Sequence, residues 1–208
     1  MFMNIITVSR EFGSGGRELG KRLADCLGYD YYDSEIISAV AQKSGMDPDY
    51  VENTLNNHGW KDQAITFRAT LGSVSYIGAS KISLLLEQKK VLESIALMGK
   101  NCVIVGRNAD EILREYAPFN IFVCASKEAK LARCRERAPE DENLTDKELS
   151  RKMKQIDSVR SQTRELMSGA PWGRRDAYHL TVNTTDWKIK ELVPAVADFA
   201  ARWFGREK

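Results

Sequence analysis

Apolar residues follow two alternating spacings along this chain. Short β-branched or aromatic runs, typical of buried strands, lie near residues 5–8, 29–32, 101–107, 120–124 and 177–183. Stretches with apolar residues three or four positions apart follow these runs and are typical of helices that pack on a sheet. The first begins after residue 16, and the others cover 34–43, 82–98, 109–116, 127–167 and 189–203. Strands that alternate with helices predict an α/β fold, with a parallel sheet covered by helices on both faces.

Two long segments of the chain depart from this simple alternation. Residues 56–80 contain several glycines and little periodicity, and they are predicted to form a mobile, partly helical insertion. The charged stretch 127–167 is predicted to break near Pro139, because proline removes a helical hydrogen bond. Thr145 and Glu148 then form a capping box, which predicts that a second helix begins there.

The last predicted helix has an uncertain beginning and an internal proline. Thr184, Thr185 or Asp186 can each cap it through a side-chain oxygen. Pro194 then either kinks the helix or restarts it.

A glycine-rich turn connects the first predicted strand to the first predicted helix. Gly13, Gly15 and Gly16 let the backbone turn sharply and approach a ligand closely. Free backbone N–H groups at the start of the helix, together with its dipole, form a ready site for an anion. A nucleotide phosphate is therefore the leading ligand, and the alternative is an ordinary strand-to-helix turn that needs glycine for steric reasons.

This turn departs from the standard phosphate-binding loop. The usual pattern places a lysine for the β- and γ-phosphates and a hydroxyl for Mg²⁺ after its second glycine. If Gly15 is that second glycine, Arg10 takes the place of the first, Gly16 takes the lysine position and Arg17 takes the hydroxyl position. The turn is predicted to bind phosphate without either of those two side chains.

Two further polar residues follow predicted strands, where parallel sheets bind ligands. Arg107 can grip a phosphate with two hydrogen bonds, or it can form a salt bridge with Asp110 or Glu111. Asp33 can contact an acceptor, or it can cap the next helix.

Arginines recur on the predicted helices of the 127–167 stretch. Arg133 and Arg137 are four residues apart and share one helical face, as do Arg160 and Arg164. Such cations can stabilise the charge that spreads over the oxygens of a transferred phosphoryl group. The alternative is a solvated helix whose charges pair with one another.

Composition narrows the class of protein and its partners. The length of 208 residues, of which 43% are hydrophobic, predicts a single domain. The net charge is only +2 and acidic and basic residues are interleaved, so binding to nucleic acid is not expected. No apolar run is long enough to span a membrane, and no signal-peptide pattern precedes the first strand. The four cysteines form no C-x-x-C pair and are expected to be reduced thiols, which predicts a cytoplasmic protein.

These motifs together resemble the cytidylate kinase-like proteins, which are relatives of the nucleoside monophosphate kinases. The resemblance covers almost the whole chain; it rests on Ser9–Glu18 and Val103–Asp110, with support from Asp157–Arg160, Trp172–Gly173 and Tyr178–Thr184. It implies one P-loop kinase domain over residues 1–208, with an acceptor-binding insertion at 34–81 and a helical lid at 127–167. It also implies transfer of the γ-phosphoryl group of ATP to a nucleoside monophosphate, with Mg²⁺.

The resemblance also assigns roles to residues of this chain. The ATP phosphates would be held by Arg10, Phe12, Gly13, Ser14, Gly15, Gly16, Arg17 and Glu18. The acceptor would be held by Asp33, Arg107, Asp110 and Asp157, with Asp110 standing in for a carboxylate that Asn108 replaces. The catalytic cations would be Arg17, Arg133, Arg137 and Arg160. Either Arg10 or Arg17 would replace the missing lysine, and Ser14 or Glu18 would orient Mg²⁺ directly or through water.

The expected function is ATP-dependent phosphorylation of a small nucleotide, with CMP as the first acceptor to test. Two alternatives stay open at this point: a P-loop kinase for another small acceptor, and a nucleotide-binding regulatory protein that has lost catalysis. The sequence does not indicate an oligomeric state.

Overall fold

A computed structural model describes residues 3–56, 71–138, 144–169 and 171–206 of the chain. The sheet has five parallel strands in the described residues, in the order β2-β3-β1-β4-β5. They are β1 (Ile5–Arg10), β2 (Asp30–Tyr32), β3 (Cys102–Val105), β4 (Phe119–Cys124) and β5 (Leu180–Asn183). The central strand β1 pairs with β3 on one side and β4 on the other, so that Ile6 lies opposite Val103 and Phe119. The predicted parallel sheet is confirmed.

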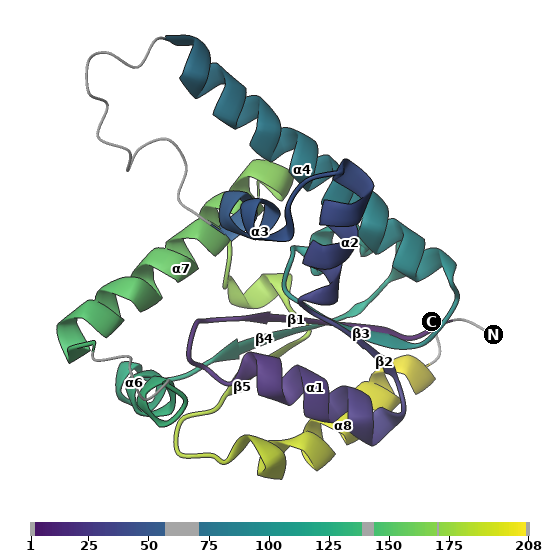
Figure 1. The fold of residues 1–208 in the computed structure, drawn as a ribbon. Helices are drawn as coiled ribbons and strands as arrows, with labels where there is room; N and C mark the ends of the chain where they lie inside the picture. The colour runs from purple at the N-terminus through teal and green to yellow at the C-terminus, as the bar shows by residue number, and fades with distance from the viewer. Residues whose placement is uncertain (1–2, 57–70, 139–143, 170, 207–208) are drawn as a thin grey trace.

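Helices cover both faces of the sheet, as the apolar spacing predicts (Figure 1). On one face, α1 (Gly16–Leu27) and α8 (Ile189–Gly205) bury Leu19, Leu23 and Val193 against the sheet. On the other face lie α2 (Glu35–Ser44), α3 (Pro48–Asn56) and α4 (Leu71–Leu97), whose apolar side chains form a second core with Ile104. The two cores fix the orientation of the strands and of the loops that leave them.

Three further helices lie near the carboxyl ends of the strands. After β3 come the short α5 (Ala109–Ile112) and a 3₁₀ turn (Arg114–Tyr116); a second 3₁₀ turn, Arg175–Ala177, precedes β5. The predicted charged stretch forms α6 (Lys127–Glu136) and α7 (Asp146–Ser168), which lie beyond the carboxyl edge of the sheet (Figure 1). The predicted capping box is present at the start of α7, with Thr145 and Glu148 exchanging hydrogen bonds.

The structure corrects the beginning of one predicted helix and the end of another. Helix α4 begins at Leu71 and not near residue 82, and Gly72 and Gly78 weaken the periodic signal of its first turns. Residues 57–70 of the predicted insertion lie outside the described residues. The α-helix after β3 also ends at Ile112, and a 3₁₀ turn continues to Tyr116.

The predicted cap of the last helix is also wrong. Helix α8 begins at Ile189 without a side-chain cap, and it continues through Pro194 to Gly205. Thr184 is instead buried, and its hydroxyl donates to the carbonyl of Ser14 at 2.7 Å. This threonine therefore fastens the glycine-rich turn instead of starting a helix.

None of the helices in the described ranges combines the length and apolar character needed to cross a membrane.

Candidate functional site

Two cavities open at the carboxyl edge of the sheet, where parallel sheets bind ligands. The larger, of about 540 Å³, lies between the glycine-rich turn and helices α6 and α7. The smaller, of about 230 Å³, lies between the β3–α5 turn and helices α3, α4 and α7. The cavities share four lining residues, which are Arg10, Phe12, Arg17 and Arg160. The site is thus a pair of cavities with a cationic junction.

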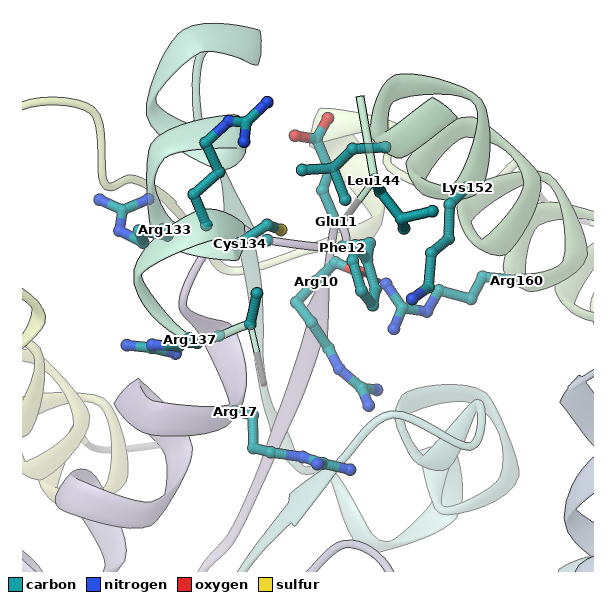
Figure 2. A pocket seen from close by; sticks show the side chains of 15 residues that line it. Arg10, Glu11, Phe12, Arg17, Arg133, Cys134, Arg137, Leu144, Lys152 and Arg160 are labelled. Carbon is teal, nitrogen blue, oxygen red and sulfur yellow. Dashed lines mark hydrogen bonds between the residues drawn. The ribbon is translucent and has the colours of Figure 1, made fainter. Parts of the chain in front are cut away.

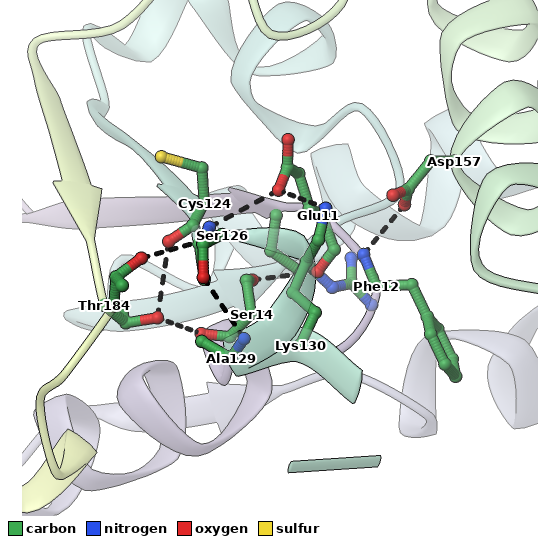
Figure 3. A network of polar contacts seen from close by, with 12 residues as sticks. Glu11, Phe12, Ser14, Cys124, Ser126, Ala129, Lys130, Asp157 and Thr184 are labelled. Atoms are coloured by element: carbon green, nitrogen blue, oxygen red, sulfur yellow. Dashed lines mark hydrogen bonds and ion pairs between the residues drawn. The ribbon is translucent and has the colours of Figure 1, made fainter. Parts of the chain in front are cut away.

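The glycine-rich turn is held tightly from several directions. Gly13 and Gly15 have φ values of 78° and 82°, which only glycine adopts without strain. A Cβ on Gly13 would lie 2.9 Å from Sγ of Cys134, because α6 packs directly on the turn. The hydroxyl of the fully buried Ser14 donates to the carbonyl of Glu11 at 2.8 Å (Figure 3). The turn is therefore rigid where it meets the first turn of α1.

The larger cavity has a strong excess of positive charge. The arginines and lysine that line it come from the end of β1, the start of α1, the region of α6 and α7 (Figure 2). They are Arg10, Arg17, Arg133, Arg135, Arg137, Lys152 and Arg160. Glu11 is the acidic residue among those lining it, and Lys130 already pairs with that carboxylate at 2.8 Å. A cavity of this charge favours a polyanion of several negative charges.

A buried carboxylate organises the junction between the cavities. Asp33, at the end of β2, is 3% exposed and forms an ion pair with Arg17. Nη2 of Arg10 lies 3.7 Å from Oδ1 of Asp33, which is beyond hydrogen-bond distance. Burial, and after it the nearby Arg160, lower the pKa of Arg10 to about 9, although Asp33 acts to raise it. A second anion at this junction would relieve that electrostatic cost.

Helix α7 is fastened to the turn by an acidic and a basic residue. The carboxylate of Asp157 accepts from the backbone N–H of Phe12 at 2.8 Å and from Arg160 at 2.9 Å (Figure 3). The same Nη1 of Arg160 donates to the carbonyl of Arg10 at 3.0 Å. Burial raises the pKa of Asp157 and lowers that of Arg160, while their mutual attraction opposes both shifts. This contact sets the position of Arg160 at the junction.

The smaller cavity is shaped by an unusual turn after β3. Gly106, Arg107 and Asn108 have φ values of 75°, 60° and 52°, a left-handed run that is rare for residues with side chains. Nε2 of Gln88, which is 2% exposed on α4, donates to the carbonyl of Arg107 at 3.0 Å. Gly106 is in contact with the guanidinium of Arg10, where a Cβ would clash. Strained backbone of this kind is typical of functional sites.

The other predicted site residues lie around the cavities and not in them. Asp110 is buried in an ion pair with Arg164 of α7, so it is not the partner of Arg107. Glu18 pairs with Arg22 and Arg137; burial opposes the effect, but those two guanidinium groups hold the pKa of Glu18 below its usual value. The expected role of Asp33 as a helix cap is also not seen, because Ser34 occupies the N-cap position of α2.

Arg133 reaches across the larger cavity wall. It donates to the carbonyls of Thr184 and Trp187, at the turn between β5 and α8, the second of these at 3.3 Å. Helix α6 is thus linked to the turn after the edge strand β5 as well as to the glycine-rich turn.

Several lining residues were not predicted from the sequence. Gln88, Glu52 and Trp172 line the smaller cavity, and Arg135 and Lys152 line the larger one. Gln88 had a detectable signal, because it is a polar residue at a core position of an otherwise apolar helix face. Trp172 belongs to a motif that supports the resemblance, but no site role was assigned to it. Glu52 had no signal, because its place depends on contacts with segments distant in sequence.

The charge of the larger cavity suits a polyphosphate, whereas the described residues offer little for Mg²⁺. The Ser14 hydroxyl is buried in its bond to Glu11, and the Glu18 carboxylate is held by two arginines. Among the described residues, no group of three or more His, Cys, Asp or Glu side chains could hold a metal ion. A metal at this site would therefore rest mainly on the phosphate oxygens.

This geometry agrees with what a comparison of families finds. The model of the cytidylate kinase-like family matches residues 5–186. The chain belongs to the cytidylate kinase-like family. No curated protein matches the chain. Its membership and its fold together make this chain a P-loop kinase, and hence a nucleotide-binding phosphotransferase.

Solved structures share the fold of this family member. An uncharacterised protein from Eubacterium ventriosum superposes with a TM-score of 0.70 at 20% identity, over 96% of this chain and 99% of its own. The shikimate kinase from Bacteroides thetaiotaomicron gives 0.56 at 14% identity, over 96% and 99% of the two chains. The shikimate kinase from Acinetobacter baumannii gives 0.52 at 15% identity, over 98% and 96%. At these identities the likeness concerns the P-loop kinase fold alone.

Proposed function

We propose that this protein transfers the γ-phosphoryl group of ATP to a nucleoside monophosphate, with CMP as the first candidate. The observation that carries the proposal is the pair of cavities that meet at Arg10, Arg17 and Arg160. ATP occupies the larger cavity and the acceptor the smaller one. The reacting oxygens then meet at the shared arginines.

The described residues supply positioning and charge, and no covalent enzyme intermediate is required. Phosphoryl transfer spreads negative charge over the oxygens of the transferred group, so several fixed cations lower its barrier. Arg10 and Arg160 are held by buried contacts, whereas the side chain of Arg17 is 68% exposed and can follow the ligand. We assign the role of the missing lysine to Arg10, with Arg17 assisting.

ATP and the acceptor are assigned to different elements of the fold. Arg133 and Arg137 of α6 face the ATP phosphates as part of a lid formed by residues 127–167. Arg107 holds the acceptor phosphate, and Asp33 and Asp157 orient the arginines around it. Asp110 does not line the smaller cavity and acts indirectly, through its ion pair with Arg164. Mg²⁺, when bound, neutralises the phosphate oxygens of ATP.

A reducing, cytoplasmic location is part of the proposal. The four cysteines are free thiols, and Cys102 is buried in the sheet. Disulfides are rare in that compartment.

The direct test is to incubate the protein with ATP, Mg²⁺ and each common nucleoside monophosphate, and to follow the diphosphates by chromatography. Shikimate serves as an acceptor without a base. CDP formation that Arg107→Ala abolishes supports the proposal. Arg114→Ala is the matched control, because Arg114 is exposed and pairs only on the surface with Glu111. ATP binding without any diphosphate product would refute the proposal and favour a regulatory role, whereas shikimate phosphorylation would identify another acceptor class.

A further inference from the structure

One wall of the smaller cavity contains an aromatic side chain that the phosphate chemistry does not use. Trp172 lines this cavity and is half-buried there. A tryptophan in the wall of a polar cavity provides a flat apolar surface and one N–H donor.

The sheet holds Trp172 in a fixed place. Its ring packs edge-on against Phe122 of β4, with ring centroids 5.4 Å apart and planes at 80°. Phe122 in turn contacts Tyr178, at a centroid distance of 4.9 Å. Gly173 has a φ of 74°, and a Cβ there would lie 3.1 Å from Cζ of Phe122. The Trp172–Gly173 turn therefore sits directly on a rigid aromatic side chain of the central sheet.

Polar and charged groups of the same cavity come from other elements. Arg107 comes from the turn after β3, Arg160 from α7, and Glu52 and Gln88 from α3 and α4. Nε2 of Gln88 donates to the backbone carbonyl of Arg107, so it holds the turn that carries this cation. The cavity thus combines cations for a phosphate with a flat apolar surface for a planar group.

We propose that Trp172 determines acceptor specificity by stacking against the planar base of the acceptor. The inference rests on the proposed function, because it assigns the base of the acceptor to the smaller cavity. A saturated ring offers no π-face, so it gains less from this wall than a nucleobase does.

The test separates the base from the phosphate by using two ligands and three variants. CMP carries both groups, and ribose 5-phosphate carries the phosphate without the base. Trp172→Leu should weaken CMP binding by about 5- to 150-fold, which is the range of one base–aromatic stack. The same variant should leave the affinity for ribose 5-phosphate within about twofold, and Trp172→Phe should retain most of the CMP affinity. In turnover, the loss should raise KM more than it lowers kcat.

Tryptophan fluorescence supplies a readout that does not depend on catalysis. CMP should quench the emission of the parent protein and of Trp203→Phe, and Trp172→Phe should remove this response. Trp203 is the matched control because it packs with Phe119 and His179 at α8, and it lines neither cavity. ATP binding by each variant shows that it is folded.

The outcomes distinguish this inference from the proposed function. CMP-dependent quenching of Trp172, with no diphosphate formed from any nucleoside monophosphate, supports the inference and refutes the proposed reaction. CDP formation with an unchanged KM in Trp172→Leu overturns the inference and leaves the reaction in place. Equal weakening of CMP and ribose 5-phosphate also overturns it, because that result assigns Trp172 a structural role only.

Discussion

Replacing Arg164 by methionine should lower the free energy of unfolding by about 3–5 kcal/mol, the usual cost of removing one partner from a buried ion pair. The side chains of Arg164 and Asp110 are only 3% and 2% exposed, so water cannot replace the lost contact. Burial already raises the pKa of Asp110, against the opposing charge of Arg164. The variant would keep this carboxyl group in place without the cation that compensates it.

The same reasoning predicts the pH dependence of the loss. Without Arg164, the pKa of Asp110 in the folded state rises further above its value in the unfolded chain. The folded state then binds more protons than the unfolded state between those two pKa values, so the stability of the variant falls as pH rises through that window. The deficit relative to the parent protein should therefore be larger at pH 8 than at pH 5.

Urea unfolding at both pH values measures these effects. Removing both charges with Asp110→Leu and Arg164→Met should recover most of the loss, because an apolar pair carries no desolvation cost. Arg202→Met is the matched control; its ion pair with Asp198 on α8 is exposed, and its removal should not change the midpoint. A loss below about 1 kcal/mol for Arg164→Met, or a double variant no more stable than the single one, would refute the reasoning.

Three other substitutions test the junction and the turn after β3. Gln88→Leu should leave the Arg107 carbonyl without its donor, and acceptor KM should rise while ATP affinity is unchanged, as measured by steady-state kinetics and calorimetry. Arg107→Gly and Arg107→Ala should be equally inactive. Thermal unfolding should nevertheless show the glycine variant to be more stable by about 0.5–1 kcal/mol. The φ of residue 107 is 60°, and glycine relieves more backbone strain there than it adds in entropy of the unfolded chain. Arg10→Met should raise the free energy of unfolding of the ligand-free protein and abolish ATP binding. Because the pKa of Arg10 in the folded state is lowered to about 9, this gain in stability is present below pH 9 and shrinks as the pH rises through that value.

The sheet and the glycine-rich turn were predictable because their signals are local. The β-branched run before Gly13 fixes a strand, the glycines fix a turn, and the leucine spacing of α1 fixes the face that packs on the sheet. The pairing of Asp110 was not predictable, because its partner Arg164 lies 54 residues away on a helix that only the fold brings near. The start of α4 was missed because Gly72 and Gly78 interrupt the local signal of its first turns, although the helix runs back to Leu71.

The position of Arg10 explains how a turn without the usual lysine can still serve two ligands. A lysine at the start of the first helix would extend from the turn itself. Arg10 extends instead from the end of β1, and its guanidinium packs against Gly106 of the turn that holds the acceptor cavity. One buried cation thereby lines both cavities; the backbone carbonyl of Arg10 accepts from Arg160, and its guanidinium lies 3.7 Å from the carboxylate of Asp33. The buried charge of Arg10 carries a desolvation cost until an anion binds beside it. ATP and the acceptor should therefore strengthen each other's binding only if both phosphates contact Arg10 without repelling each other. The sign of the coupling between ATP and acceptor binding therefore reports whether Arg10 bridges the two phosphates.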